Sequence, residues 1–514
     1  MTDWDDTCDV LVVGSGAGGM SGAYTAAREG LDVLLIEATD QFGGMSAYSG
    51  GGMWFPCNAA LKRAGSQDTM EHARAYYRAV VGDRTPESLQ DAYLEGGRAL
   101  IDYLERDRQF RFMAFPWPDY FGRVPHALPE GRHIVLESFP TEELGPLKTQ
   151  LRPALPEERR GAEPPTVLAA GQALIGRFLL ALSRMPNVRL RTNTALTDLI
   201  LEDGRIAGAV VRVGDATSRI AVRRGVIIAA GGFERNGALR ERYGVPGEVA
   251  GSMAPPGNLG QALQAAIDAG AAVDLMDQAW WSPGLLQPDG AATFTVGIDG
   301  GIFVDQDGRR FVSETLPYDR LGREVITAMK TRGMTLPYWL VYDDRDGGMP
   351  PIQYPNLPFD DPAAYRAAGL WRSAPTIEAL AEVIGVPGDA LAATVARFNA
   401  FAAEGRDGDF ERGAELYERM FTGGAAALEP ISRGPFHAAA FGLSDLGTKG
   451  GVKVDEAARV LDTHGEVIPG LYAAGNSMAA VSGEAYPGGG NPIGSSMVFA
   501  HLAALNISKQ GSGT

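Results

Sequence analysis

The chain has 514 residues, enough for more than one domain, and its 45% hydrophobic and 21% charged residues are typical of a globular protein. A net charge of −17 excludes a nucleic-acid-binding protein, because phosphate binding needs a basic surface. Cys8 and Cys57 are too few for a disulfide framework or a cysteine-ligated zinc site, and six scattered histidines show no metal-ligand spacing. We therefore expect no metal.

The N-terminus and the apolar runs indicate where the protein works. Residues 1–6 (MTDWDD) are acidic where a secretory signal would be basic, and no apolar run reaches membrane-spanning length. We expect a cytoplasmic protein with no transmembrane segment. A hydrophobic substrate would favour loose association with a membrane surface.

A βαβ unit opens the chain. Residues 8–13 predict a buried parallel strand, residues 17–29 a helix, and residues 31–37 a second strand. This order is typical of a nucleotide-binding domain.

The residues after this unit show helical patterns first and strand patterns later. They predict, in chain order, helices at 70–82 and 86–106, an irregular stretch rich in proline and aromatic residues at 113–131, a helix at 172–184, and several strands within 188–228 with a hairpin signal at 202–204.

The character of the sequence changes twice more. Residues 278–440 are richer in Pro, Trp and Tyr and lack βαβ periodicity, whereas a parallel-sheet strand returns at 470–476 and a last helix at about 494–508. We therefore predict that the two ends of the chain form one domain, 1–277 and 441–514, interrupted by a catalytic, substrate-binding domain at 278–440.

A glycine-rich turn directly follows the first strand. Gly14, Gly16 and Gly19 allow a tight turn, close approach of a pyrophosphate, and close packing of helix on strand. The pyrophosphate would lie on backbone N–H groups at the positive end of the helix dipole. Glu37 ends the next strand about 20 residues on, where a carboxylate accepts a hydrogen bond from a ribose hydroxyl.

A second Gly/Ser-rich loop, residues 42–52, indicates FAD in preference to NAD, because FAD needs a further cradle beyond the ribose. Residues 229–232 and 470–476 each end a strand and resemble the later flavin-fold segments of the glutathione-reductase-like class. The loop 488–494 leads to a helix that we expect to begin near Ser495. Its positive end would lie where negative charge gathers on a reduced flavin.

The predicted cofactor is thus FAD. The predicted fold is α/β, a glutathione-reductase-like Rossmann FAD-binding domain with an inserted smaller α+β catalytic (cap) domain. The residues predicted to bind the cofactor are Gly14, Gly16, Ala17, Gly18, Gly19, Glu37, Ala38, Gly43, Gly44, Met45, Ser46, Ser49, Gly50, Gly51, Ala230, Gly231, Gly475, Asn476, Asn491, Pro492 and Ile493.

Four motifs give the chain a family resemblance. They are Phe-Gly-Gly…Ser-Ala-Tyr-Ser-Gly at 42–50, Ser-Glu-Thr-Leu-Pro-Tyr-Asp at 313–319, Ser-Asp-Leu-Gly-Thr-Lys-Gly-Gly at 444–451, and Tyr-Pro-Gly-Gly-Gly at 486–490. Over nearly its full length the chain resembles the fumarate reductase and succinate dehydrogenase superfamily. Within it, the chain is most similar to the 3-ketosteroid delta-1-dehydrogenases.

The resemblance implies oxidation of the C1–C2 bond of a 3-ketosteroid, with a hydride going to flavin N5 and a proton to a tyrosine. Carried over by motif, Tyr318 is the proton-accepting base and Tyr120 its hydrogen-bonded partner. The Tyr486 hydroxyl and the Gly490 backbone N–H hold the ketone oxygen. An electron acceptor, not identified by the sequence, would reoxidise the enzyme.

Two departures from the family pattern bear on the substrate. Family members often read Tyr-Pro-Gly-Pro-Gly where this chain has a more flexible glycine run at 486–490, and residues 117–130 are distinctive. We interpret Glu314 as structural, and Trp280 and Trp281 as either the lining of a flat steroid pocket or core.

Three alternatives remain at this point. A desaturase of another cyclic ketone, such as cyclohexanone, would use the same tyrosines. A fumarate-reductase-like enzyme fits less well, because the His-His-Thr segment of such enzymes is replaced here by residues 445–449. A flavin-binding protein without catalysis is disfavoured by the three intact tyrosines.

Overall fold

The computed structural model describes residues 4–424 and 427–510, so residues 1–3 of the acidic N-terminus lie outside the described part. The chain forms two compact units. The first comprises residues up to Val245, Ala254–Ala279 and the chain from Gly447 onward; the second comprises Pro246–Met253 and Trp280–Leu446.

The division differs from the predicted boundaries mainly at Pro246–Met253, a segment expected in the first domain. It joins the second unit because Ser252 Oγ donates to Asp445 Oδ1 at 2.8 Å and Met253 N donates to Asp445 O at 2.9 Å. No sequence pattern marks this pairing across almost 200 residues.

A parallel sheet is the centre of the first unit. Its strands run in the order β21-β22-β11-β1-β2-β8, with β22, β11, β1, β2 and β8 parallel, and β10 and β9 extend β11 in antiparallel fashion. Their bounds are β1 Asp6–Val13, β2 Val33–Ile36, β8 Val188–Arg191, β9 Thr194–Glu202, β10 Arg205–Val213, β11 Ala216–Ile228, β21 Arg459–Leu461 and β22 Val467–Ala473.

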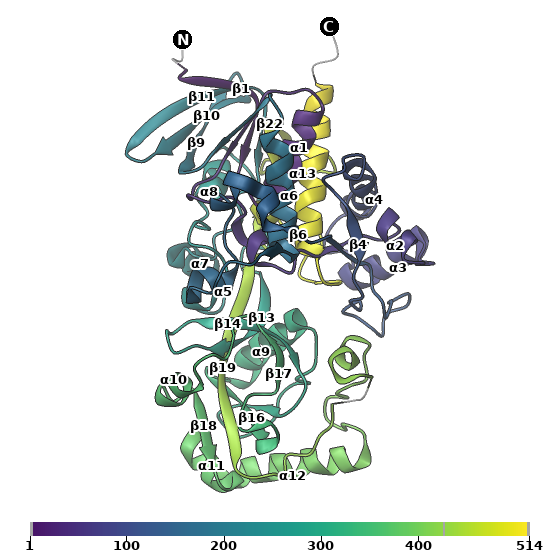
Figure 1. Ribbon diagram of the computed structural model, residues 1–514, viewed down its shortest axis with the longest axis vertical. Helices are drawn as coiled ribbons and strands as arrows, with labels where there is room; N and C mark the ends of the chain where they lie inside the picture. Colours follow the sequence, from purple (N-terminus) through teal and green to yellow (C-terminus); the bar gives the residue numbers. More distant parts are fainter. Residues whose placement is uncertain (1–3, 425–426, 511–514) are drawn as a thin grey trace. The chain divides into compact units, whose positions relative to one another are not determined.

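Helices α1 (Ala17–Arg28) and α13 (Asn491–Lys509) lie side by side against this sheet (Figure 1). Ser21 Oγ donates to the Met497 carbonyl at 3.1 Å, and Thr25 Oγ1 lies 2.8 Å from His501 Nδ1. Because α1 is buried along almost its whole length, the first and last parts of the chain share one core.

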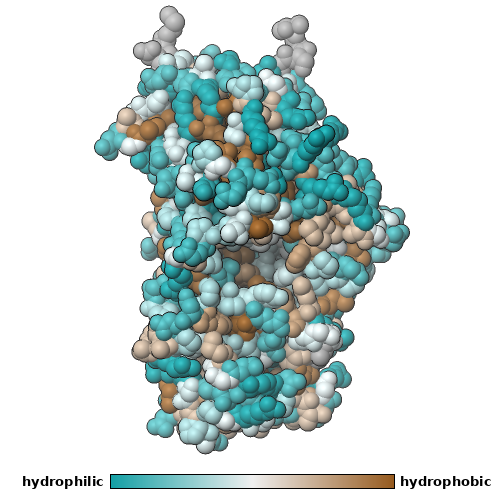
Figure 2. Space-filling view, in the orientation of Figure 1, coloured by the Kyte–Doolittle hydropathy of each residue, from teal (hydrophilic) through white to brown (hydrophobic). Residues whose placement is uncertain are grey.

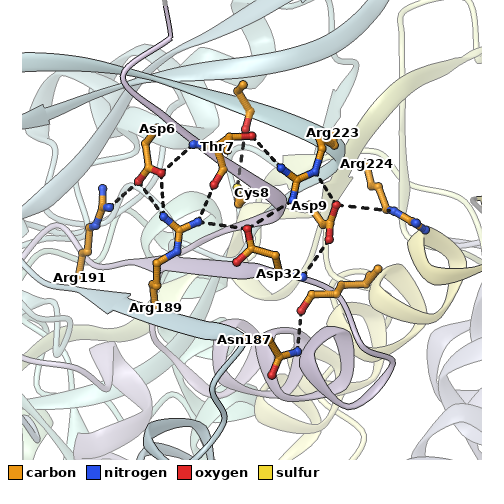
Figure 3. Close-up of polar contacts among 12 residues, drawn as sticks. Asp6, Thr7, Cys8, Asp9, Asp32, Asn187, Arg189, Arg191, Arg223 and Arg224 are labelled. Carbon is orange, nitrogen blue, oxygen red and sulfur yellow. Dashed lines mark hydrogen bonds and ion pairs between the residues drawn. The ribbon is translucent and has the colours of Figure 1, made fainter.

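The amino ends of the parallel strands carry an ion-pair cluster (Figure 3). Arg189 Nη1 contacts Asp6 at 2.7 Å and Arg223 Nε contacts Asp9 at 2.8 Å. Burial alone would raise the pKa of both carboxyls, but hydrogen bonds from these arginines and from backbone N–H groups bring each pKa below its usual value. The cluster holds the strands together at their amino ends, away from the carboxyl ends.

Smaller elements complete the first unit. A three-stranded sheet has the order β3-β5-β4. The remaining α-helices and strands are α2 Ala59–Arg63, α3 Met70–Val81, α4 Glu87–Leu104, α5 Leu155–Arg160, α6 Ala170–Ser183, α7 Gly237–Tyr243, α8 Gln261–Asp268, β3 Met53–Trp54, β4 Phe112–Ala114, β5 His133–Leu136, β6 Phe139–Pro140, β7 Val167–Leu168, β12 Val273–Asp274 and β20 Gly451–Val452.

The second unit is built on a sheet of order β15-β16-β19-β13-β14-β17, with β18 beside β19. Its strands are β13 Ala279–Leu286, β14 Ala292–Ile298, β15 Ile302–Val304, β16 Tyr338–Asp343, β17 Ile352–Pro355, β18 Trp371–Ala374 and β19 Phe436–Thr448, and its helices are α9 Tyr318–Arg332, α10 Pro362–Ala367, α11 Ile377–Ile384 and α12 Gly388–Glu404. Each of the strand pairs in this sheet whose residue-by-residue pairing is known is antiparallel. This explains why the sequence of this unit lacks βαβ periodicity.

Most predicted elements are confirmed within a few residues. The hairpin at 202–204 joins β9 to β10 with Asp203 and Gly204 both at positive φ. The start of the last helix was predicted wrongly: α13 begins at Asn491, not near Ser495. Gly490, at φ +91°, caps it, and Pro492 suits a first turn because its missing N–H has no partner there anyway.

The visible surface is mostly hydrophilic, with apolar residues in small groups, as a net charge of −17 would lead one to expect (Figure 2). None of the helices in residues 4–424 and 427–510 is long and apolar enough to cross a membrane.

Candidate active site

The glycine-rich turn lies where β1 passes into α1. A Cβ on Gly14, which has φ +97°, would lie 2.4 Å from the Ala229 carbonyl oxygen, and one on Gly19 would lie 1.8 Å from the Gly14 carbonyl oxygen. Any side chain at these two positions would collide with backbone. They are therefore glycine because strand and helix pack so closely.

Gly16 and Gly50 are glycine for a different reason. A Cβ on Gly16 would meet nothing nearer than Ser46 Oγ at 3.4 Å, and one on Gly50 would meet nothing within 4 Å. Neither residue has a positive φ, so neither packing nor backbone strain requires glycine there. Open space over bare backbone, which at Gly16 lies at the N-terminus of α1, fits the close approach of a dinucleotide cofactor.

Glu37 follows β2 at the same sheet edge and is buried. Its Oε2 accepts from Ser15 N at 3.2 Å and from Ser15 Oγ at 2.5 Å, and its Oε1 accepts from Thr39 N at 3.0 Å. The Thr39 hydroxyl also donates to Oε1, at 2.9 Å, so four protein donors match the roughly four acceptor sites of the carboxylate. A ribose hydroxyl would therefore take the place of the Ser15 or Thr39 hydroxyl. The fixed carboxylate fits the predicted ribose contact.

The second glycine-rich loop contacts the first directly. Ser46 Oγ accepts from Ala17 N at 3.0 Å, and Gly43 N donates to Ser15 Oγ at 2.9 Å. Gly43 and Gly44 have φ of +131° and +49°, which start the short 3-10 helix Gly44–Tyr48. The sequence folds this way because a φ of +131° is open without strain only to glycine, and a φ of +49° favours glycine.

Ser477 and Ser496 connect the two later segments, 229–232 and 470–476, with each other and with the glycine-rich turn. Ala230 N donates to Ser477 Oγ at 3.0 Å, and Ser477 Oγ donates to the Gly231 carbonyl at 2.9 Å. Cβ atoms added to Gly18 or Gly475 would lie 2.3 Å and 2.5 Å from Ser496 Oγ. The segments containing the predicted cofactor-binding residues therefore form one continuous surface at the carboxyl ends of β1, β2, β11 and β22, where α/β sheets bind nucleotides.

Two predicted catalytic tyrosines lie together beside this surface. The Tyr120 and Tyr486 rings are 5.2 Å apart and meet edge to face, and both side chains are buried. Tyr120 N donates to the Pro487 carbonyl at 3.0 Å, and the Tyr76 hydroxyl donates to the same carbonyl at 2.6 Å. The stretch 113–131 is thus joined to the glycine run that precedes α13.

That glycine run is packed against aromatic rings and backbone. A Cβ on Gly488 would lie 2.4 Å from Trp54 Cδ1, one on Gly489 would lie 2.7 Å from Trp117 Cδ1, and one on Gly490 would lie 2.5 Å from Gly52. The sequence suggested flexibility here. The structure shows close packing, so Gly490 is held beside the second cofactor loop.

Sequence reasoning missed a buried ion cluster next to Tyr120. Arg132 pairs with Asp119 and, through Nε, with Asp68 at 2.7 Å, and its side chain and that of Asp119 have no exposed surface. Trp54 Nε1 donates to Asp119 Oδ1 at 2.8 Å. Burial raises the pKa of the Asp119 carboxyl to about 6, although Arg132 and Trp54 oppose the rise. The only sequence signal was Asp119 within the stretch rich in Pro and aromatics and Arg132 directly after it.

His133 is buried nearby and is uncharged at neutral pH. Burial lowers the pKa of its imidazole to about 4, so the ring is neutral. A Cβ on Gly52 would lie 1.6 Å from its Nε2, which shows that the ring packs directly on the glycine loop. Within the described residues, no group of three His, Cys, Asp or Glu is arranged to hold a metal.

The motif at 444–451 supports the turn before Tyr486. Lys449 is buried and its Nζ donates to the Glu484 carbonyl at 2.6 Å. Thr448 N and Oγ1 donate to Glu234 Oε2, whose partner oxygen accepts from Asn258 at 2.6 Å. This motif therefore fixes the segment that carries Tyr486.

Tyr318, the predicted base, belongs to the second unit, where it begins α9. The residue is 8% exposed, and its ring meets that of Phe294 edge to face, with the ring centroids 4.7 Å apart. It lines a hollow together with Pro283, Thr295, Val296, Gly297, Ile298, Glu314, Thr315, Leu316, Leu321, Tyr417 and Phe421. Its walls are mostly apolar, and the Tyr318 phenol is one of the few polar groups among them.

The segment before Tyr318 is fixed by buried charges. Glu314 accepts from Arg310 at 2.8 Å and from Arg412 at 3.0 Å, and its Oε1 also accepts from Phe303 N. This bears out the structural interpretation of Glu314. Trp280 and Trp281 are each 2% exposed and do not line the hollow around Tyr318, so they are core residues.

Comparisons with known proteins identify the family of this chain. An FAD binding domain family matches residues 9–493. The 3-oxosteroid 1-dehydrogenase of Mycolicibacterium smegmatis is 36% identical, with 97% of each chain covered. The chain belongs to the 3-oxosteroid 1-dehydrogenase family.

Two further proteins are similar to this chain over nearly its full length. The 3-ketosteroid delta1-dehydrogenase of Sterolibacterium denitrificans, solved with 1,4-androstadiene-3,17-dione, has a TM-score of 0.91 and 32% identity, covering 98% of this chain and 100% of its own. The 4-oxocyclohexanecarboxylate 2-dehydrogenase of Sinomonas cyclohexanicum is 33% identical over 99% of this chain and 94% of its own. The chain is a flavoprotein of this family, an FAD-dependent oxidoreductase acting on CH–CH bonds.

Proposed function

We propose that the enzyme introduces the C1–C2 double bond of a 3-ketosteroid. The observation that carries the proposal is the buried pair Tyr120 and Tyr486, whose rings lie 5.2 Å apart next to a fixed Gly490 at the start of α13. Identity of 36% to a 3-oxosteroid 1-dehydrogenase over almost the full length supports the same substrate class.

The first chemical task is to acidify the C–H beside the ketone. We propose that the Tyr486 hydroxyl and the Gly490 N–H donate to the ketone oxygen and stabilise the negative charge that develops there. Loss of one such donor typically costs about 3 kcal/mol of transition-state stabilisation. The close contact of Gly490 with Gly52 supports this role, because a donor that is already fixed need not be ordered during the reaction.

The second task is proton removal from C2, which we assign to Tyr318. A phenol ordinarily ionises near pH 10, so a base at neutral pH needs its anion stabilised. We assign this stabilisation to the Tyr120 hydroxyl. The C2 proton passes to the Tyr318 oxygen, the C1 hydrogen leaves as hydride, and the C1–C2 double bond forms. Bound FAD supplies the hydride acceptor. An electron acceptor must then remove two electrons in each turnover.

Tyr318→Phe tests this assignment. The variant should bind FAD like the parent and reduce it at least about 1,000-fold more slowly with androst-4-ene-3,17-dione, since general base catalysis typically contributes about 100- to 10,000-fold. Phe294→Leu, next to Tyr318 but without a proton-transfer role, is the matched control. Normal turnover in Tyr318→Phe would reject Tyr318 as the base.

A desaturase of a smaller cyclic ketone is the second candidate. The 33% identity to a 4-oxocyclohexanecarboxylate 2-dehydrogenase favours it, and the same three tyrosines would serve. The two candidates differ in the ring that reduces the flavin, and a comparison of kcat/KM for a 3-ketosteroid and for 4-oxocyclohexanecarboxylate separates them.

A further inference from the structure

Trp117 lies three residues before Tyr120, and its indole Nε1–H donates to the Tyr120 hydroxyl at 3.1 Å. We propose that Trp117 is a positioning residue that orients the Tyr120 hydroxyl, so that Tyr120 presents its own proton to the catalytic base. The proposal rests on the proposed function, in which Tyr120 stabilises the Tyr318 anion.

The chemistry of the two groups fixes the direction of this hydrogen bond. An indole N–H can only donate, whereas a phenol hydroxyl donates one hydrogen bond and accepts up to two. Tyr120 must therefore be the acceptor toward Trp117, which leaves its O–H to donate to another group. A hydroxyl that accepts a hydrogen bond also becomes a stronger donor, because linked hydrogen bonds polarise one another.

The backbone of Trp117 is fixed, and its indole lies beside a buried ring. Trp117 N donates to the Glu130 carbonyl at 3.1 Å, and a Cβ on Gly131, which has φ +64°, would lie 1.7 Å from the Trp117 carbonyl oxygen. The Trp117 ring lies 6.2 Å from the buried His133 ring. A half-buried side chain on so constrained a backbone has little freedom to turn its N–H away.

Gly489 provides the space that the indole occupies. A Cβ there would lie 2.7 Å from Trp117 Cδ1, 2.8 Å from Trp117 Nε1 and 3.2 Å from Tyr120 Oη. Gly489 does not have a positive φ, so its backbone does not require glycine. Contact with the Trp117–Tyr120 pair does. The glycine that departs from the family's usual proline thus matches Trp117.

The contact itself is tested without substrate. In protein labelled with 15N-tryptophan, the Trp117 indole N–H signal, assigned by its loss in Trp117→Phe, should move and exchange faster with solvent in Tyr120→Phe. Phe294→Leu, in the other unit, should leave that signal unchanged. A Trp117 signal that ignores the loss of the Tyr120 hydroxyl overturns the proposal, whether or not a ketosteroid is the substrate.

The role in catalysis is tested by the pH dependence of anaerobic flavin reduction in Trp117→Phe. The rise in rate with pH should move up by about one unit, which is about a tenfold loss at neutral pH that disappears at alkaline pH. Ketone affinity should stay the same. Gly489→Ala should cause a similar shift in the parent and no further shift in the Trp117→Phe background. An unchanged profile, or an equal loss at every pH, overturns the proposal.

Discussion

Arg132→Met should destabilise the first unit more than any exposed ion-pair substitution. The guanidinium lies between Asp119 and Asp68, has no exposed surface, and stacks 5.2 Å from the Tyr76 ring. Methionine would fill much of the space but leave two buried carboxylates without their cation. Asp119 would have to take up a proton, and its hydrogen bonds from Trp54 and Leu128 would weaken.

The cost follows from this burial. Removing one member of a buried ion pair typically costs about 3–5 kcal/mol, against a total stability of about 5–15 kcal/mol for a folded protein. At about 2 °C per kcal/mol, the thermal transition of the FAD-bound enzyme should fall by about 6–10 °C. The flavin-reduction rate should also fall, because Asp119 precedes Tyr120 and pairs with the backbone at Gly488.

Arg84→Met is the matched control, since Arg84 makes an equally close pair with Asp274 at 2.7 Å but both side chains are 37% exposed. Exposed pairs contribute about 0–1 kcal/mol, so its transition should move little. Adding Asp119→Asn and Asp68→Asn to Arg132→Met should recover part of the loss. If Arg132→Met unfolds at the same temperature as the parent, the cluster does not stabilise this region and the reasoning is refuted.

Three further outcomes follow from the site. Tyr486→Phe should lower kcat/KM for the ketone by about 100-fold, measured by steady-state kinetics, because an oxyanion donor is lost; unchanged kinetics would remove that role. Gly16→Ala should keep the fold but weaken FAD binding about tenfold or more, because its Cβ would occupy open space beside the cofactor. Gly19→Ala should impair folding, because its Cβ would lie 1.8 Å from a backbone oxygen. Fluorescence titration with FAD measures the first effect, and thermal unfolding measures the second. Because the pKa of Asp6 is lowered in the folded protein, its contribution to stability is present above about pH 4 and lost as the pH falls through the folded value; denaturant titrations of Asp6→Asn should therefore converge with the parent at acid pH, and parallel curves would contradict the linkage.

The first half of the cofactor site could be predicted because its constraints are local. Gly14 and Gly19 are required by the turn from β1 to α1, and Glu37 ends the next strand of the same βαβ unit. A two-residue hairpin at Asp203 and Gly204 was equally predictable, since both need positive φ.

The rest depends on contacts between residues distant in sequence. Asp119, Arg132 and Asp68 show no spacing pattern, and only the fold brings them into one buried cluster. The pairing of Ser252 with Asp445 moved a boundary for the same reason. The glycine run at 488–490 was interpreted as flexible, because the aromatic rings that pack against it come from residues more than 350 positions earlier.

Anaerobic mixing of the FAD-bound enzyme with single ketones tests the central claim most directly. A panel of androst-4-ene-3,17-dione, a saturated 3-ketosteroid, cyclohexanone and succinate is added to separate samples, and flavin absorbance is followed. We predict rapid bleaching by a 3-ketosteroid, a new C1–C2 double bond in the recovered product, and no bleaching by succinate. Bleaching by succinate alone, or by none of the ketones, would contradict the account.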